Sequence, residues 1–351
     1  MKGVIMAGGL GTRLRPLTLH RPKPMVEVIG IPVINFVKDA LSSAGISEVI
    51  VTTGYRGESL ASLVESWNGE GLSAWVNEEE VPMGTAGSVR LLKDELKETF
   101  IVGSGDTLAS FDIAALIKEH KESGAAATMA LWEVEDPSEY GIVGMSMDLD
   151  GELDSSLHSG WIVKFLEKPT AEQAFSKVIN AGLYILEPEV LELIPEGEKF
   201  DWSRQVFPAM LEKGMPLRGS TISGIWFDIG RPSDLLKAQS VILGEGEQLL
   251  TELPPGEIGN GGFISPDANI EGECIDSVIL ENCHINSGTV IKGSLMMSNC
   301  IVAEGCSISS TIIGSGTVVG EGVNLDGCVI GDDVAVPAFS DWQGIKFPNG
   351  I

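Results

Sequence analysis

The chain has 351 residues, enough for two ordinary domains, and its 43% hydrophobic and 21% charged residues are normal for a globular protein. A formal net charge of −27 argues against nucleic acid or an anionic membrane as the main partner. No stretch approaches the roughly 20 apolar residues of a membrane-spanning helix, and the start resembles a buried strand rather than a signal peptide, so we expect a cytoplasmic protein.

Positive charge is concentrated at the beginning of this acidic chain. The first 25 residues contain no acidic residue and five cations, which are Lys2, Arg13, Arg15, Arg21 and Lys23. Such a basic island predicts that an anionic ligand is received there.

Strand and helix patterns alternate over the first two thirds of the chain. Short apolar runs at 4–6 and 100–102 each end in glycine, 48–53 is β-branched, and 125–132 is predicted as a further strand. Helical spacing of apolar residues covers 34–44 and 111–120. This order predicts an α/β fold, a Rossmann-like, mostly parallel sheet with helices on both faces. Ligands of such sheets bind at the carboxyl ends of the strands.

From residue 258 the helix patterns stop and an internal repeat of 17 to 18 residues begins. The segment 277–285 aligns with 294–302, 311–319 and 328–336, and apolar residues recur every six positions within each repeat. This hexapeptide pattern predicts a left-handed parallel β-helix, in which each coil buries its apolar face on the next. We therefore expect a catalytic domain at 1–235, a connection at 236–257 and a β-helix domain at 258–351.

All five cysteines lie in this repeat region, at positions 274, 283, 300, 306 and 328. Their odd number and the absence of a C-x-x-C pair argue against a disulfide framework or a zinc site. Cys283 and Cys300 fill the repeat position of Thr317 and Val334, so we expect the thiols to serve as small packing groups.

The basic island surrounds a glycine-rich turn. Residues 7–14 read AGGLGTRL, and 22–25 read PKPM. Three glycines after a strand let backbone amides approach a phosphate chain closely. The turn lacks both the Gly-Lys-Ser/Thr of a P-loop and the third glycine of the dinucleotide fingerprint.

These motifs closely resemble the signature of sugar-1-phosphate nucleotidyltransferases. Further matches follow in the order of that family at 82–87, 105–106, 140–143, 167–169, 180–182 and 226–230. The resemblance covers nearly the whole chain, and many members of the family also carry the C-terminal β-helix. It implies an enzyme that joins a nucleoside triphosphate to a sugar 1-phosphate and releases pyrophosphate.

The resemblance also implies roles for individual residues. Catalytic cations would be Arg13, Lys23 and Lys168, and the ligands of a Mg²⁺ ion would be Asp106 and Asp228. Nucleotide contacts would come from Gly8, Gly9, Gly11, Thr12, Gly84, Thr85 and Gly87. Sugar contacts would come from Tyr140, Gly141, Glu167, Asn180 and Gly182.

The substrates remain open at this stage. Residues 14–18, 22–24, 84–87 and 134–140, together with the β-helix, resemble the mannose-1-phosphate guanylyltransferase branch, which uses GTP and mannose 1-phosphate. UTP or dTTP with glucose 1-phosphate is the alternative, because a few pocket hydrogen bonds decide such specificity.

Two other functional classes also remain open. A β-helix occurs in acyltransferases, for which His284 is the candidate base, although its repeat position predicts an outward surface residue. A regulatory subunit without turnover is the other possibility, against which the retained Arg13, Lys23, Asp106, Lys168 and Asp228 argue. Stacked coils leave flat surfaces, so we also expect a homo-oligomer formed through the β-helix; a strictly monomeric species in sedimentation would contradict this.

Overall fold

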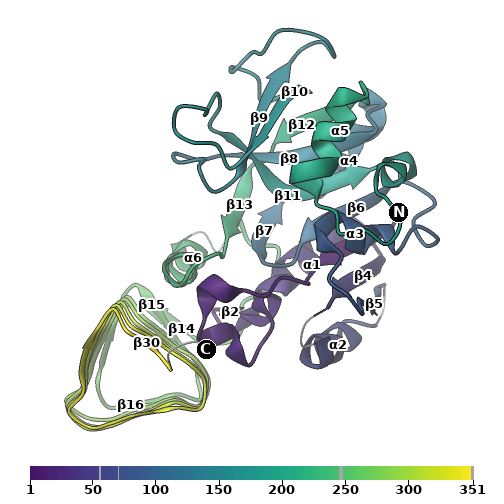
Figure 1. Cartoon of the computed structure of the whole chain (residues 1–351). Coiled ribbons are helices and arrows are strands. Elements are labelled where there is room, and N and C mark those ends of the chain that lie inside the picture. The colour runs from purple at the N-terminus through teal and green to yellow at the C-terminus, as the bar shows by residue number, and fades with distance from the viewer. Residues whose placement is uncertain (55–56, 70, 245–247, 349–351) are drawn as a thin grey trace. The chain divides into compact units, whose positions relative to one another are not determined.

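The computed structural model describes residues 1–54, 57–69, 71–244 and 248–348 (Figure 1). The chain divides into two compact units, each of which contains two segments of the sequence. The first unit comprises 1–9 and 36–226, and the second comprises 10–35 and 227–351. No helix in the described ranges is long and apolar enough to cross a membrane.

The first unit is built on one nine-stranded sheet. Its strands in spatial order are β5 (Ser73–Glu78), β4 (Glu48–Thr53), β1 (Gly3–Met6), β6 (Phe100–Ser104), β11 (Val178–Leu186), β8 (Ala127–Glu133), β12 (Leu217–Thr221), β10 (Ser159–Glu167) and β9 (Gly141–Ser146). The predicted α/β class is confirmed, and strand 48–53 has the predicted bounds.

Parallel pairing is confined to part of this sheet. The neighbours β5, β4, β1 and β6 are all parallel, as are β8 and β12. Strand β11 runs antiparallel to both β6 and β8, and β10 runs antiparallel to both β12 and β9. The sheet is therefore mixed, with a parallel part that leads into the glycine-rich turn after β1.

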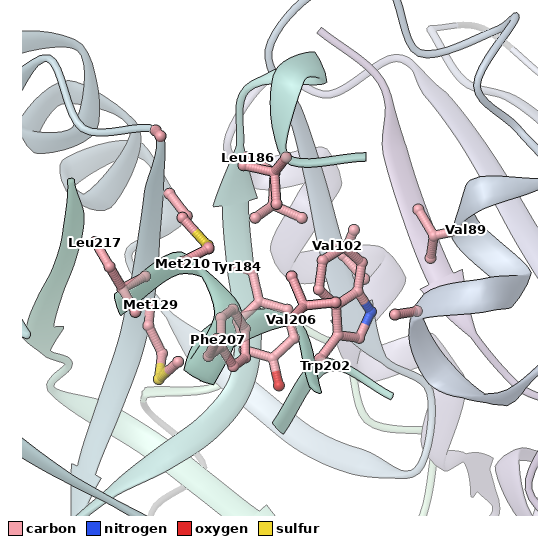
Figure 2. Close-up of a cluster of buried hydrophobic side chains, with 14 of the residues drawn as sticks. Val89, Val102, Met129, Tyr184, Leu186, Trp202, Val206, Phe207, Met210 and Leu217 are labelled. Carbon is pink, nitrogen blue, oxygen red and sulfur yellow. The ribbon is translucent and has the colours of Figure 1, made fainter. Parts of the chain in front are cut away.

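The helices interleave with these strands as the sequence predicts. They are α1 (Val33–Ser43), α2 (Gly57–Ser66), α3 (Gly84–Arg90), α4 (Ile113–Ser123), α5 (Phe207–Glu212) and, in the second unit, α6 (Pro232–Gly244). Asp112 caps α4 by accepting a hydrogen bond from the Ala115 amide at 3.0 Å. Figure 2 shows α5 and the preceding π-turn (Trp202–Val206) placing Trp202, Val206 and Phe207 over Tyr184 of β11, in a core from which water is excluded.

Shorter elements complete the two units. In the first unit, strand β7 (Thr107–Phe111) follows β6, and a 3-10 turn covers Pro188–Leu193. Strand β13 (Gly224–Asp228) crosses the division at residue 226. The segment 10–35 of the second unit contains three 3-10 turns, at Thr12–Leu14, Leu17–Leu19 and Lys23–Met25, and a hairpin of β2 (Glu27–Val28) and β3 (Ile31–Pro32).

The C-terminal part of the second unit is a parallel β-helix of three sheets, seen end-on as a triangle in Figure 1. One sheet contains β14 (Glu257–Gly259), β15 (Gly262–Ile264), β18 (Val278–Ile279), β21 (Leu295–Met296), β24 (Ile312–Ile313), β27 (Val329–Ile330) and β30 (Lys346–Phe347). The second contains β16 (Asn269–Ile270), β19 (His284–Ile285), β22 (Ile301–Val302), β25 (Val318–Val319) and β28 (Ala335–Val336). The third contains β17 (Glu273–Ile275), β20 (Val290–Lys292), β23 (Ser307–Ser309), β26 (Asn324–Asp326) and β29 (Asp341–Gln343).

The length of the predicted repeat equals the sequence separation of paired residues in these sheets. Val278 pairs with Leu295, Leu295 with Ile312 and Ile312 with Val329, each partner lying seventeen residues further on. Within a coil, one circuit of three strands, the residues of the six-residue pattern point inward and are fully buried. Each buried isoleucine side chain removed from water contributes about 1.5–3 kcal/mol.

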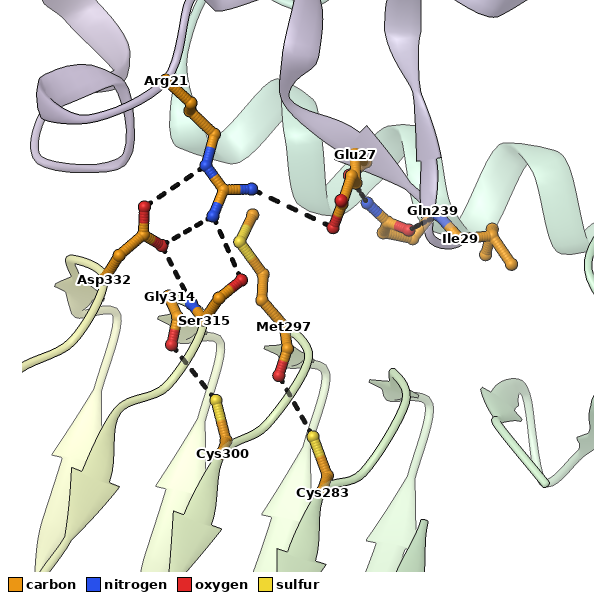
Figure 3. Close-up of polar contacts among 10 residues, drawn as sticks. All are labelled: Arg21, Glu27, Ile29, Gln239, Cys283, Met297, Cys300, Gly314, Ser315 and Asp332. Carbon is orange, nitrogen blue, oxygen red and sulfur yellow. Dashed lines mark hydrogen bonds and ion pairs between the residues drawn. The ribbon is translucent and has the colours of Figure 1, made fainter. Parts of the chain in front are cut away.

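The cysteines behave as the sequence predicts. Cys283, Cys300, Cys306 and Cys328 are buried, Cys274 is half-buried, and all five thiols are free. The Cys283 and Cys300 sulfurs each donate to a carbonyl of the next coil, those of Met297 and Gly314, at 3.1 Å (Figure 3). Burial raises the pKa of the Cys274 thiol to about 11. The four buried thiols pack within the apolar core of the β-helix.

The predicted domain boundaries stay predictions. Residues 10–35 belong to the same unit as the β-helix, and the predicted connection 236–257 begins inside α6. Residues 245–247 of that connection and 349–351 of the predicted β-helix domain lie outside the described residues.

Candidate functional site

A pocket of ≈ 270 Å³ in the first unit gathers several predicted site residues. Thr85, Glu167, Lys168 and Gly182 line it together with Ser104. An adjoining pocket of ≈ 390 Å³ shares Glu167 and Lys168. A larger pocket of ≈ 650 Å³ between 133–138 and 169–178 contains no predicted site residue, so size does not identify the site.

Parallel pairing explains why one wall of the site forms where it does. Met6, the last residue of β1, pairs with Ser104, the last residue of β6. The Gly105 amide donates to the Met6 carbonyl at 2.9 Å just beyond the strand ends. Gly8 and Asp106 therefore follow the carboxyl ends of neighbouring parallel strands, as the sequence predicts. The Ser104 hydroxyl donates to Asp106 Oδ1 at 2.6 Å.

A second segment of the chain, residues 198–200, packs against the motif at 82–87. The amides of Ala86 and Gly87 donate to the Phe200 carbonyl at 2.9 and 3.1 Å. A Cβ atom at Gly84, whose φ is 77°, would lie 2.6 Å from that carbonyl oxygen. A Cβ atom at Gly87 would lie 2.9 Å from the Glu198 carbonyl. Both glycines are thus required by the close approach of segment 198–200, whatever ligand binds beside them.

Thr85 and Asp201 fix the next turn of that segment. The Thr85 hydroxyl donates to Asp201 Oδ2 at 2.8 Å and accepts from the Trp202 amide at 3.1 Å. Asp201 Oδ1 accepts from the amides of Ser203 and Arg204, each at 3.0 Å, and so caps the π-turn. This arrangement places Ser203 and Arg204 at the pocket.

Asn180 organises the other side of the pocket. Its amide nitrogen donates to the Tyr184 hydroxyl at 2.9 Å and to Ser203 at 3.2 Å, and its oxygen accepts from the Gly182 amide at 2.8 Å. Burial raises the pKa of Tyr184, which keeps its hydroxyl protonated. These hydrogen bonds hold Gly182, Tyr184 and Ser203 together around the pocket.

Glu167 and Lys168 bring opposite charges to the end of β10. Burial and, to a lesser extent, Asp201 raise the pKa of Glu167, while Lys168 and Arg204 act against this shift. Lys168 is exposed and is held at φ 50°, a conformation that non-glycine residues seldom adopt. Its amide donates to the Tyr140 carbonyl at 2.8 Å.

Gly141 and Tyr140 lie directly opposite Glu167 and Lys168. Gly141 pairs with Glu167 across β9 and β10, and a Cβ atom there would lie 2.8 Å from the Glu167 carboxylate. The Tyr140 ring packs edge-on against Trp226, with centroids 5.9 Å apart. A Cβ atom at 141 would also lie 2.6 Å from the Phe165 ring, so glycine leaves room for both side chains.

The second unit holds the other predicted catalytic groups. The Lys23 ammonium, on a side chain that is 10% exposed, lies 3.9 Å from Asp228 Oδ1. A Cβ atom at Gly230 would lie 3.1 Å from Arg13 Nη2 and 3.3 Å from Asp228 Oδ2, so these two charged groups flank Gly230. Gly11, at φ 60°, packs against Lys23 and Thr18. Thr12 begins the 3-10 turn that carries Arg13, and both of these residues are exposed.

The predicted metal ligands have the donor chemistry that Mg²⁺ prefers. Asp106 belongs to the first unit and Asp228 to the second. Within the described ranges, no group of three His, Cys, Asp or Glu side chains could hold a metal ion. Mg²⁺ commonly takes one or two carboxylates and completes its shell with water and substrate phosphates, so a pair of aspartates fits this ion better than it fits zinc.

Sequence reasoning missed seven residues of the pocket, which are Met6, Ser104, Tyr184, Asp201, Trp202, Ser203 and Arg204. The last four lie together at the start of the π-turn. A helix-capping aspartate followed by Trp-Ser-Arg is the one signal that could have marked this turn. Its approach to the motif at 82–87 depends on backbone contacts that the sequence pattern does not encode.

Two family models match successive parts of the chain. The Nucleotidyl transferase family model matches residues 2–245, and the GMPPB C-terminal domain model matches residues 258–339. A probable mannose-1-phosphate guanylyltransferase 3 of Oryza sativa subsp. japonica is 33% identical over 313 residues, 83% of each chain. The mannose-1-phosphate guanylyltransferase catalytic subunit beta of Xenopus tropicalis is 35% identical over 282 residues, 78% of this chain and 74% of that one.

A solved structure shares the fold. A putative glucose-1-phosphate thymidylyltransferase from Bacillus anthracis, in complex with a sucrose, superposes with a TM-score of 0.60 and 24% identity. The match covers 69% of this chain and 94% of that one. The motifs, the fold and the relatives agree, and the chain belongs to the nucleotidyl transferase family as a nucleotidyltransferase enzyme.

Proposed function

We propose that the enzyme transfers the guanylyl group of GTP to mannose 1-phosphate, giving GDP-mannose and pyrophosphate. Relatives with this activity in their names align with most of the chain at 33 and 35% identity. The observation that carries the proposal within the molecule is the pocket that gathers Thr85, Glu167, Lys168 and Gly182.

The reaction needs neutralisation of charge more than acid or base groups. A phosphate oxygen of mannose 1-phosphate attacks the α-phosphorus of GTP, and the bond from that phosphorus to the bridging oxygen breaks. The electron pair leaves with pyrophosphate. Because both reactants are anions, the protein must hold them in line and offset their repulsion.

Three cations are assigned to these phosphates. Lys168, at the pocket edge beside Glu167, binds the phosphate of the sugar. Arg13 stabilises the departing pyrophosphate, and Lys23 contacts the phosphates near the reacting centre. The proximity of Arg13 and Lys23 to Asp228 supports placing both in one polyphosphate site.

The sugar and the nucleoside are assigned to residues of the family motifs. Glu167, Asn180 and Gly182 contact the sugar hydroxyls, and the loop of Tyr140 and Gly141 closes beside them. Gly8, Gly9, Gly11 and Thr12 approach the nucleotide, together with the motif of Gly84, Thr85 and Gly87. The packing of Gly84 and Gly87 against segment 198–200 supports a rigid wall at this point.

Asp106 and Asp228 are proposed to hold Mg²⁺. When bound, this ion would offset the negative charge that develops on the phosphates. The Ser104 hydroxyl orients one Asp106 oxygen, which is the support that a ligating carboxylate commonly receives.

We place the enzyme in the cytoplasm, because five free cysteines suit a reducing compartment. Self-association through the β-helix is retained as a proposal, supported by Ile301 and Val318, which are 43% and 45% exposed on adjacent strands of one sheet.

The activity is tested by measuring pyrophosphate release over a grid of nucleoside triphosphates and sugar 1-phosphates with Mg²⁺. We expect GTP with mannose 1-phosphate to give the highest kcat/KM. A preference for UTP or dTTP with glucose 1-phosphate would overturn the substrate assignment. Release with no pair would indicate a non-catalytic subunit, and an added arm with acetyl-CoA and an amino-sugar phosphate tests acyl transfer.

Lys168→Met should raise the KM for mannose 1-phosphate about 10- to 100-fold, because a charge-assisted hydrogen bond contributes about 1.5–3 kcal/mol. The KM for GTP should stay the same. Lys164→Met is the matched control, since this exposed lysine of β10 lies over the Phe175 ring and lines neither pocket that contains Lys168. A change confined to the KM for GTP would contradict the role of Lys168.

Asp106→Asn should abolish Mg²⁺-dependent turnover with little change in the melting temperature, because the amide keeps the shape of the carboxylate and loses its charge. Chelation of divalent ions should have the same effect on the wild-type enzyme, and added Mg²⁺ should restore only the wild type. Near-normal turnover of the variant would remove Asp106 from the metal site.

Glu167→Gln should raise the melting temperature at pH 7 while impairing the use of mannose 1-phosphate. The raised pKa of Glu167 means that the folded state favours the protonated carboxyl. The stability that the Glu167 carboxyl contributes is therefore fully present below its pKa in the unfolded chain, about 4.3. It is lost as the pH rises through its higher pKa in the folded protein. The increase in melting temperature of Glu167→Gln should shrink on acidification. Glu172→Gln, a change at an exposed residue, should show no increase. A lower melting temperature for Glu167→Gln at pH 7 would contradict this argument.

A further inference from the structure

Arg21, a member of the predicted anion-binding island, is bound to the β-helix. Its Nη2 donates to Asp332 Oδ1 at 2.8 Å and its Nε to Oδ2 at 3.3 Å (Figure 3). Nη2 also donates to the Ser315 hydroxyl at 3.1 Å. The side chains of Arg21 and Asp332 are only 17% and 8% exposed, so this fork is better shielded from solvent than a surface ion pair.

Two further contacts join the same segment to the last coils. Lys346 of β30 donates from Nζ to the backbone carbonyl of Arg13 at 3.1 Å. A Cβ atom at Gly331 would lie 3.2 Å from Pro16, so this proline packs onto the corner that precedes Asp332. Arg13, Pro16 and Arg21 are thus held at successive points along 10–21.

The other end of the segment is attached to α6. The Ile29 amide donates to Gln239 Oε1 at 2.7 Å, and Gln239 Nε2 donates to the Glu27 carbonyl at 3.3 Å (Figure 3). Glu27 also lies 4.0 Å from Arg21 Nη1. Both ends of the stretch that contains Lys23 therefore contact other parts of the second unit.

The segment has little regular structure of its own. Before the β2–β3 hairpin it contains three 3-10 turns of three residues each, closed by bonds such as Leu14 N to Gly11 O at 3.0 Å and Met25 N to Pro22 O at 2.9 Å. Such turns are too short to be stable alone. The placement of Arg13 and Lys23 must come from the surfaces that the segment contacts.

We propose that the last two coils of the β-helix position Arg13 and Lys23 for turnover, with Arg21, Asp332 and Lys346 as positioning residues. The proposal deepens the function proposed above and rests on the roles assigned there to Arg13 and Lys23. The β-helix then contributes to kcat, because a misplacement of about 1 Å in a catalytic group can cost about 100-fold in rate.

The test compares Asp332→Asn and Lys346→Met in the full chain. Each should lower kcat about 10- to 100-fold, while the KM for mannose 1-phosphate, bound through Lys168 of the first unit, stays within about twofold by the additivity of independent sites. Glu119→Gln is the matched control, because it breaks a partly buried ion pair of the first unit in which Arg218 Nε lies 2.7 Å from Glu119. The control should lower the melting temperature and leave kcat unchanged.

A double variant distinguishes positioning from general weakening of the fold. If Arg21 acts through Asp332, Arg21→Met combined with Asp332→Asn should lose no more in kcat than the worse single variant. Lys346→Met, a change at an exposed side chain, keeps the test valid if the Asp332 variant folds poorly.

Hydrogen exchange without substrates supplies a readout that is independent of activity. Asp332→Asn should speed exchange of the Leu14, Leu19 and Met25 amides, and Glu119→Gln should not. Unchanged exchange, or faster exchange with unchanged kcat, would overturn the proposal. If the wild-type enzyme transfers no nucleotidyl group at all, the proposed function fails, while the exchange data still decide whether these coils hold the segment.

Discussion

Register between parallel strands is the constraint on which both units depend. In the first unit the pairing of Met6 with Ser104 brings two loops to one edge of the sheet, and the glycine turn and Asp106 follow from it. In the second unit the pairing of Val278 with Leu295, repeated coil after coil, fixes the height of every corner of the β-helix. Backbone hydrogen bonds between strands set the positions of these loops and corners, and the loops and corners in turn place the side chains that they carry.

The cations of the first 25 residues look alike in the sequence but have different partners in the structure. Lys2 lies 2.9 Å from Glu95 and 3.5 Å from Glu48, and Arg21 is bound to Asp332. Lys23 and Arg13 instead lie beside Asp228. Net positive charge in a segment therefore predicts only the region of an anion site, and burial and ionic partners distinguish its cations from one another.

The sequence predicted the elements whose pattern is local or periodic. Strand 48–53, helix α1 and the seventeen-residue coils are confirmed, since alternation, helical spacing and repetition are visible along the chain. It did not predict the antiparallel β11 within the sheet, the approach of segment 198–200 to the motif at 82–87, or the attachment of Arg21 to Asp332. These depend on contacts between residues that lie from 45 positions apart (Val178 and Glu133) to 311 positions apart (Arg21 and Asp332), for which one sequence contains no direct signal.

Each coil of the β-helix adds one strand spacing, so the number of coils decides how far along its axis a given corner lies. Removal of one seventeen-residue repeat would leave every inward position matched and the ladder intact, so stability alone would tolerate it. It would, however, shift the corner that holds Asp332 and the strand that holds Lys346 by one strand spacing, about 4.8 Å. That is longer than the hydrogen bonds that reach Arg21 and Arg13. The number of coils that precede Asp332 is therefore constrained by the loop that its carboxylate contacts.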